Sequence, residues 1–319
     1  MGRPLDGRTT RALGLVVGAT ALTGAVTFGW GTGVELRSFR LRRVTVPVLP
    51  AGTAALRVLH LSDLHLLPRQ HRKRDFVRTL DRLDPHLVVN TGDNIAAPDA
   101  VSALVDTLGP LLDRPGCFVF GSNDLSSPTP RNPLLYLLPE HLQPPRHHAD
   151  DMPVKQVREL FTAAGWLDLE NAGGTVIATG RDLGPTGRVE VALTGTGDAH
   201  IDLDDLATVT GAPVGRPAIA VTHAPYRRVL DCFTAHRWPL VLAGHTHGGQ
   251  LRVPGHGALI SNCDLPPAQA SGLSRWPPDP SGGAWLHVSA GLGTSPWAPV
   301  RLNCLPEATL LTLVPRFAR

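Results

Sequence analysis

The stretch Gly244-His245-Thr246-His247-Gly248-Gly249-Gln250 directly follows a short apolar run at residues 239–243. Four or five apolar residues bounded by Gly, Pro, Asp or Asn predict a buried strand that ends in a loop. Two imidazoles one residue apart, flanked by glycines at such a strand end, are typical of a metal-binding loop. The same arrangement, an apolar run that stops at metal-binding side chains, recurs four more times along the chain.

These four earlier runs also end at hydrogen-bonding or metal-binding residues. They are residues 57–61 before Ser62-Asp63-Leu64-His65, 87–90 before Thr91-Gly92-Asp93-Asn94, 117–120 before Gly121-Ser122-Asn123-Asp124, and 218–222 before His223-Ala224-Pro225. In open α/β sheets the loops at the carboxyl ends of the strands converge on one crevice. We therefore expect five strands to bring their polar side chains to one place.

The expected cluster has the donor chemistry of a metal site. Imidazole nitrogens and carboxylate or amide oxygens suit Zn, Mn, Fe or Ni, and the motifs include no thiolate that would select a softer metal. One catalytic zinc takes three protein ligands and a water, so two ions that share a bridging carboxylate fit the larger set better. The predicted metal ligands are Asp63, His65, Asp93, Asn123, His223, His245 and His247.

The spacing within the motifs adds a geometric expectation. In an extended chain every second side chain points to the same side, so the Asp-x-His and His-x-His pairs would each face one ion. Gly92, Gly121 and Gly244 stand next to or near proposed ligands. A residue without a Cβ lets the backbone turn sharply and pass close to an ion.

Taken in order, the Asp-x-His, Gly-Asp, Gly-x-Asn, His and Gly-His-x-His motifs resemble the calcineurin-like metallophosphoesterase superfamily, over about residues 55 to 315. Residues 242–250 are similar to its bacterial membrane-associated phosphodiesterase branch. The resemblance implies a four-layer α/β sandwich of two mixed β-sheets flanked by α-helices, with two divalent ions, Mn, Fe or Zn. It implies that one ion is held by Asp63, His65, Asp93 and His247, and the second by Asp93, Asn123, His223 and His245, with Asp93 as the bridge.

The third motif departs from the family pattern, which reads Gly-Asn-His followed by Asp or Glu. If Asn123 keeps the ligand position, Asp124 falls where the family has its catalytic histidine; if Ser122 is the ligand, Asn123 falls there. We prefer the first alignment because an amide oxygen is a better ligand than a neutral hydroxyl, so the predicted catalytic residues are Asp93, Asn123 and Asp124. The usual histidine is absent in both alignments, and the candidates to replace it as the acid are Asp124, His141, His147 and His148.

The resemblance implies an enzyme that hydrolyses phosphodiester or lipid-linked phosphate bonds. Two cations lower the pKa of a shared water and neutralise charge on the phosphoryl oxygens, so hydroxide attacks phosphorus. One alternative is a regulatory protein that keeps the fold and has lost turnover, which the missing histidine suggests. A nuclease is less favoured, and no nucleic-acid partner is expected, because the net charge is only +3 and no basic stripe with interleaved aromatics is present.

The N-terminal segment predicts a membrane anchor. From Ala12 to Val34 no residue is charged, and a helix of this length is long enough to cross a bilayer. We therefore assign residues 1–35 as a single-pass anchor in the cell membrane and residues 36–319 as the metallophosphoesterase domain. A cleaved signal segment is the alternative, and arginines on both sides of the apolar run leave the orientation open.

Periodic apolar residues predict the remaining elements. Residues 76–83, 101–108 and 154–161 have the spacing of helices with one buried face. Strands separated by such helices favour parallel crossovers. Residues 44–49, with Pro47, predict an edge strand. Later strands near residues 175–179, 189–193, 284–289 and 308–314 have fewer helices between them, which favours a second, partly antiparallel sheet.

Residues 125–153 are the predicted substrate-selecting loop. This loop is rich in proline, follows a metal motif and combines arginine with a run of leucines. On a tethered enzyme, an apolar and basic rim suits a phospholipid-like substrate, with Arg131, Leu135 and Leu138 as contacts. The alternative is that these leucines fill a small core beneath the loop.

Overall fold

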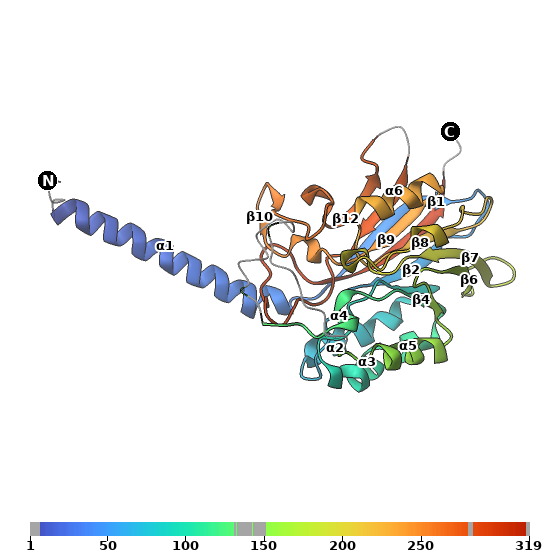
Figure 1. Cartoon of the computed structure of the whole chain (residues 1–319), viewed down its shortest axis with the longest axis horizontal. Coiled ribbons are helices and arrows are strands. Elements are labelled where there is room, and N and C mark those ends of the chain that lie inside the picture. The colour runs from blue at the N-terminus through green and yellow to red at the C-terminus, as the bar shows by residue number, and fades with distance from the viewer. Residues whose placement is uncertain (1–6, 131, 133–141, 143–150, 280–282, 317–319) are drawn as a thin grey trace.

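A computed structural model describes residues 7–130, 132, 142, 151–279 and 283–316. Two six-stranded sheets form its centre (Figure 1). The first has the order β1 (Arg40–Leu49), β14 (Glu307–Pro315), β2 (Leu56–Leu61), β3 (Leu87–Asn90), β4 (Gly116–Phe118) and β5 (Leu167–Asp168). The second has the order β12 (Gly272–Trp276), β13 (Ala284–Val288), β9 (Leu240–Ala243), β8 (Ala218–Val221), β7 (Arg188–Gly195) and β6 (Gly173–Thr179).

Both sheets are mixed. In the first, β2, β3, β4 and β5 are parallel, whereas β14 runs antiparallel to β2. In the second, β7, β8, β9 and β13 are parallel, and β6 and β12 are antiparallel edge strands. A small hairpin of β10 (Arg252–Val253) and β11 (Gly257–Ala258) lies outside them. The predicted edge strand is confirmed as part of β1, where Pro47 costs the sheet no interior hydrogen bond.

Helices cover the outer face of each sheet. Figure 1 shows α2 (His71–Thr79), α3 (Val101–Leu108) and α5 (Val154–Ala163) together on one side, and α6 (Arg227–Ala235) on the other. The four-residue helix α4 (Ser122–Leu125) follows β4. Three hydrophobic cores separate the layers: one under α2, α3 and α5, one between the sheets, and one under α6. The predicted arrangement of two mixed sheets flanked by helices is confirmed.

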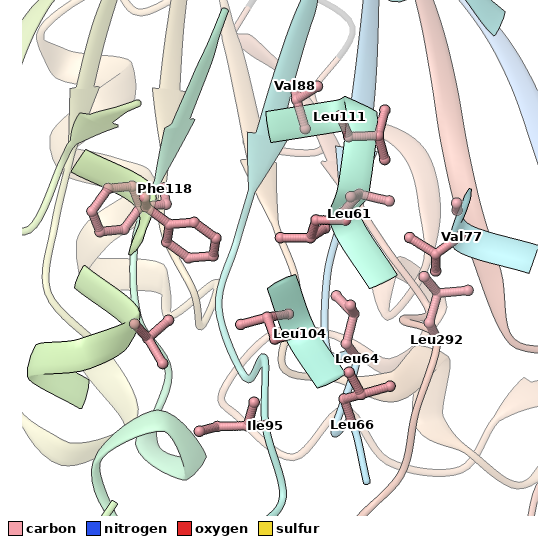
Figure 2. Packing of buried hydrophobic residues seen from close by; sticks show 14 of the residues in the cluster. Leu61, Leu64, Leu66, Val77, Val88, Ile95, Leu104, Leu111, Phe118 and Leu292 are labelled. Carbon is pink, nitrogen blue, oxygen red and sulfur yellow. The ribbon is translucent and has the colours of Figure 1, made fainter. Parts of the chain in front are cut away.

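The core beneath α2, α3 and α5 also anchors the loop after β2, which carries two proposed ligands, and the loop after β13. Figure 2 shows Leu64, Leu66 and Leu292 packed with Leu104 of α3 and Val77 of α2. All five side chains are fully buried or nearly so. Because burial of one leucine contributes about 1.5–3 kcal/mol, the loops that follow β2 and β13 are held by the core rather than left free in solvent.

Helix α1 (Gly7–Gly33) precedes the domain and projects from it in Figure 1. In the part of the chain that the structure describes, no helix combines the length and the apolar content that a membrane crossing requires. The membrane location of the chain stays a prediction. The end of α1 contacts the domain, since the Arg301 amide donates to the Gly31 carbonyl at 3.3 Å. In the 3-10 turn Glu35–Arg37 that follows α1, the buried Glu35 carboxylate accepts from the Cys304 amide at 3.3 Å.

Candidate metal centre

The five predicted strands are present as β2, β3, β4, β8 and β9, and their carboxyl ends lie at one edge. Three belong to the first sheet and two to the second, so the site forms where the two sheets meet. Backbone hydrogen bonds join the loops: the amide of Asp63 donates to the Gly92 carbonyl and that of His65 to the Asp93 carbonyl, both at 2.9 Å. The Gly244 amide donates to the His223 carbonyl at 2.9 Å. The His245 amide, which donates to both Asp63 carboxylate oxygens at 3.1 Å, joins these two pairs of loops.

The backbone at the ligands differs from the sequence prediction. The sequence predicts an extended backbone through the Asp-x-His and His-x-His motifs. This prediction is wrong, because the ligand residues have left-handed backbone. The φ angles are +48° at Asp63, +39° at His65, +67° at His245 and +50° at His247, with +55° at Asp93. Left-handed backbone costs a residue with a Cβ about 1–3 kcal/mol and persists where surrounding structure imposes it, typically at functional sites. Tight turns, rather than strand pleating, aim these side chains at the centre.

The glycines provide space for ligand side chains. A Cβ at Gly121 would collide with the Asp93 carboxylate and the His223 ring, and one at Gly244 with Ser62 and Asp63. Only Gly92 of the three has a left-handed φ, at +91°. The expected sharp turn therefore occurs at Gly92, whereas Gly121 and Gly244 are needed because ligand side chains occupy the position of their missing Cβ.

One group of four proposed ligands is assembled. Asp63, His65, Asp93 and His247 each place a donor atom within 4.8 Å of the others, and all four are buried. His65 Nε2 lies 3.3 Å from Asp93 Oδ2, and His247 Nε2 lies 3.8 Å from Asp63 Oδ1. Both ring nitrogens of His65 are buried without a hydrogen-bond partner in the structure. Because an unpartnered buried polar group is costly, these atoms fit a bound cation.

The proposed ligands of the second ion are only partly assembled. His223 Nε2 lies 3.6 Å from Asp93 Oδ2 and is also buried without a partner. The ring centroids of His223 and His245 are 5.2 Å apart. The Asn123 side-chain amide donates to Asp93 Oδ2 at 2.8 Å, and its backbone amide donates to Oδ1 at 2.9 Å. Asn123 and His223 thus lie against Asp93, and His245 lies beside His223.

Backbone carbonyls orient the three later histidines. His223 Nδ1 donates to the Thr91 carbonyl at 2.6 Å, which leaves Nε2 as the lone-pair nitrogen. His247 Nδ1 donates to the Gly293 carbonyl at 3.1 Å, and His245 Nε2 donates to the Asn262 carbonyl at 2.9 Å. Metal-binding histidines almost always use their second ring nitrogen in this way, since it fixes the tautomer and the ring orientation.

The electrostatics fit a site that needs positive charge. Burial holds the pKa of His245 and of His247 well below 6.5, so both rings are neutral and able to bind metal. Burial opposes the charged form of His223 too, but the carboxylates of Asp93, Asp198 and Asp63 raise the pKa of this residue to about 10. The carboxylates around His223 thus favour positive charge at this position, which bound divalent cations would supply.

Asp124 occupies a different place from a catalytic acid. Its buried carboxylate accepts hydrogen bonds from the amides of Asp93 and Asn94, both at 2.7 Å, and from Gly121 at 3.2 Å. Burial and the Asp93 charge raise the pKa of Asp124 to about 7. The carboxylate ties the loop after β3 to the loop after β4 and does not line the cavity at the ligands. The geometry assigns it a positioning role.

The choice between Asn123 and Ser122 as the ligand stays a prediction, because both residues line the cavity at the proposed ligands. The Asn123 side chain reaches Asp93, whereas the Ser122 amide donates to Asp198 at 2.8 Å. Asp198 also accepts from the His200 amide at 2.9 Å, so it caps the loop after β7. The predicted substrate contacts Arg131, Leu135 and Leu138, and the acid candidates His141, His147 and His148, lie outside the described residues.

The cavity at the ligands is small, about 40 Å³. Besides five proposed ligands it is lined by Ser122, Gln250, Asn262 and Ser295. None of these four side chains titrates near neutral pH. Within the described residues, the cavity therefore contains no general acid apart from proposed ligands. A volume of this size is close to that of one water or ion, so the substituents of a bound ester lie outside it.

Sequence reasoning missed the residue that holds the loop after β13, whose Gly293 carbonyl orients a proposed ligand. Arg301 is fully buried, and its guanidinium donates to the carbonyls of Ala290 at 2.7 Å, Gly291 at 3.2 Å and Gly293 at 2.7 Å. Gly293 is the residue whose carbonyl orients His247. No motif surrounds Arg301, which lies far along the chain from the ligand that it supports, so no sequence signal indicates its role.

Comparison with known proteins identifies the family. The family model "Calcineurin-like phosphoesterase" matches residues 56–249, which is more than half of the chain and includes all the proposed ligands. The chain belongs to the calcineurin-like phosphoesterase family. The proposed resemblance is therefore confirmed, and this calcineurin-like phosphoesterase is a phosphoric ester hydrolase.

Three curated relatives are similar to this calcineurin-like phosphoesterase. Phosphodiesterase YaeI of Escherichia coli K12 is 28% identical over 93% of this chain and 97% of the relative. Uncharacterized metallophosphoesterase YkuE of Bacillus subtilis 168 is 24% identical over 92% of each chain. A transmembrane protein with metallophosphoesterase domain from Bos taurus is 29% identical over 65% of this chain and 44% of its own length.

Proposed function

We propose that this calcineurin-like phosphoesterase is a phosphodiesterase that acts with two divalent metal ions. The observation that carries the proposal is the buried group Asp63, His65, Asp93 and His247, whose donor atoms lie within 4.8 Å of one another. Carboxylate and imidazole donors suit Mn, Fe or Zn. The name of the similar protein YaeI supports the choice of a diester substrate.

The residues have separate roles in this proposal. The four buried residues of the assembled group would hold the first ion, and Asp93, Asn123, His223 and His245 the second, after the Asn123 carboxamide turns its oxygen toward the ion. When bound, such ions lower the pKa of water toward neutrality and neutralise charge on phosphoryl oxygens. The carbonyls of Thr91, Gly293 and Asn262 keep the histidine rings oriented.

The leaving group departs without a protein acid in this proposal. The described residues of the cavity offer no titratable side chain beyond the proposed ligands. General-acid assistance contributes about 10²–10⁴-fold to rate, so turnover should depend strongly on the acidity of the leaving alcohol. The lipid-linked substrate and the N-terminal membrane anchor, both inferred from the sequence, remain proposals.

The test is metal-dependent turnover of bis(p-nitrophenyl) phosphate by the full chain after removal of metal and re-addition of Mn²⁺. We expect turnover only with metal, and none above background for Asp63→Ala. Retention of the Asp63→Ala rate would contradict the assignment. Stoichiometric metal binding without turnover would favour the regulatory alternative instead.

A further inference from the structure

A second cavity of about 510 Å³ lies behind the wall of the metal centre. Its apolar lining comes from three segments that are far apart in the sequence: Leu36 and Phe39 before β1, Leu67 after β2, and Leu292, Pro296 and Pro299 after β13. This volume falls in the range of about 300–1,000 Å³ that is usual for small-molecule sites. The cavity is therefore large enough for a hydrocarbon chain, whereas the metal cavity is not.

The wall between the two cavities is thin. Gly293 and Thr294 line the large cavity, and the next residue, Ser295, lines the metal cavity. On the other side Leu67 lines the large cavity, and His65, two residues earlier, lines the metal cavity. The segments 65–67 and 293–295 therefore each contribute residues to both cavities.

The rim of the large cavity is basic. Arg69 and Arg72 are exposed there, and Arg37 also lines it while donating to the Thr32 and Gly33 carbonyls at the end of α1. The Lys73 ammonium is buried in the wall and donates to the Leu64 carbonyl and to Gln70. None of the described lining residues is acidic. Apolar walls and a basic rim without acidic neighbours among its lining residues complement an anion that carries a hydrocarbon chain.

We propose that this cavity binds the hydrocarbon chain of an amphipathic phosphoester whose phosphoryl group lies at the metal centre. The inference rests on the proposed phosphodiesterase function and specifies its substrate class. Chain burial removes apolar surface from water, while Arg69 and Arg72 attract the anionic part. Substrate preference is thus set by residues 36–39, 67–73 and 292–299, none of which belongs to a metal motif.

The test compares p-nitrophenyl phosphodiesters whose second ester group is ethyl, octyl or dodecyl, all used below their micelle concentrations. The leaving group is constant, so differences report on the chain alone. We expect kcat/KM to rise at least tenfold from ethyl to dodecyl, through a lower KM. Leu36→Trp, which fills the cavity, should abolish this gain and leave ethyl ester turnover within about twofold. The double variant Arg69→Glu with Arg72→Glu should instead raise KM for every ester in the series, because each carries the same anionic phosphoryl group.

Two matched controls carry the same changes elsewhere. Ile177→Trp alters an exposed residue of β6, and Arg181→Glu alters an exposed arginine in the loop between β6 and β7, at the opposite edge of the sheet. Both should keep the chain-length gain. Loss of the gain in these controls, or its survival in Leu36→Trp, would overturn the assignment of the cavity.

A binding measurement separates this inference from the proposed function. Calorimetry should show that dodecyl phosphate binds the metal-loaded wild type at least tenfold more tightly than ethyl phosphate, and that Leu36→Trp removes the difference. If the ethyl ester is hydrolysed but neither kcat/KM nor binding depends on chain length, the inference is wrong and the proposed function stands. If no ester is hydrolysed, the proposed function fails, and calorimetry alone decides the cavity.

Discussion

Arg301 and His247 donate hydrogen bonds to the same acceptor, the carbonyl oxygen of Gly293, at 2.7 and 3.1 Å. The shared carbonyl links a fully buried guanidinium to a proposed metal ligand. Arg301 also fixes the two preceding carbonyls of the same loop, those of Ala290 at 2.7 Å and Gly291 at 3.2 Å. The orientation of His247 therefore depends on a residue that never faces the ions.

Arg301→Lys should weaken metal binding. A lysine ammonium cannot reach the same set of carbonyls with the planar fork of a guanidinium, so the Gly293 carbonyl loses its fixed position. Changes in groups that orient metal ligands typically cost 10–100-fold in metal affinity. Mn²⁺ titration by calorimetry should show a loss of this size, whereas the exposed control Arg181→Lys should match wild type. Unchanged affinity in Arg301→Lys would show that the loop is held without Arg301.

Gly121→Ala should inactivate the enzyme with little loss of structure. The added Cβ would meet both Asp93 and His223, so these side chains must move apart. Misplacement of about 1 Å can reduce turnover about 100-fold. The matched control is Gly211→Ala, because a Cβ there meets nothing within 4 Å and its φ is not left-handed. Equal turnover in the two variants, measured with an aryl diester, would contradict the close packing of the site.

Asp124→Asn tests positioning against acid catalysis. An asparagine presents an NH₂ group to amides that now donate to a carboxylate, so at least one buried amide loses its acceptor, at a cost of about 1–3 kcal/mol. We expect lower stability in urea unfolding and a lower kcat. The alkaline limb of the pH–rate profile should match that of the wild type, because Asp124 does not line the cavity at the ligands. Selective loss of that limb, greatest for poor leaving groups, would identify Asp124 as the acid instead.

A buried histidine pair makes the fold sensitive to acid. His60 of β2 and His287 of β13 join the two sheets through their Nδ1 atoms, 3.0 Å apart, and both are fully buried. Burial lowers the pKa of His287 to about 4. As pH falls below about 6.5 the unfolded imidazole takes up a proton while the folded one stays neutral until about 4. The stability is therefore complete above about 6.5 and is lost as pH falls from 6.5 toward 4.

His287→Asn should remove part of that acid sensitivity. From pH 7 to pH 5 the wild type should lose about 2 kcal/mol more unfolding free energy than the variant, as expected from the difference between pKa values of 6.5 and about 4. Urea unfolding of both proteins without metal at the two pH values provides the measurement. Equal losses would mean that the pKa of His287 in the folded state is close to the ordinary value of 6.5.

The sequence predicted the parts of this molecule that depend on local patterns. Short apolar runs identified β2, β3, β4, β8 and β9, and the residues that follow them meet at one edge. Local pattern could not predict the left-handed turns at Asp63 and His247, because loops that pack against them impose this backbone. It also could not identify Arg301, since a buried arginine that supports distant carbonyls has no sequence signature.

Five loops hold two metal ions in the proposed site, with Asp93 shared between them. The most direct measurement is an anomalous diffraction map from crystals of the full chain soaked in Mn²⁺. We predict two peaks, one among Asp63, His65, Asp93 and His247, and one among Asp93, Asn123, His223 and His245. A map with no peak among these residues, although the histidine rings keep their orientation, would contradict the account.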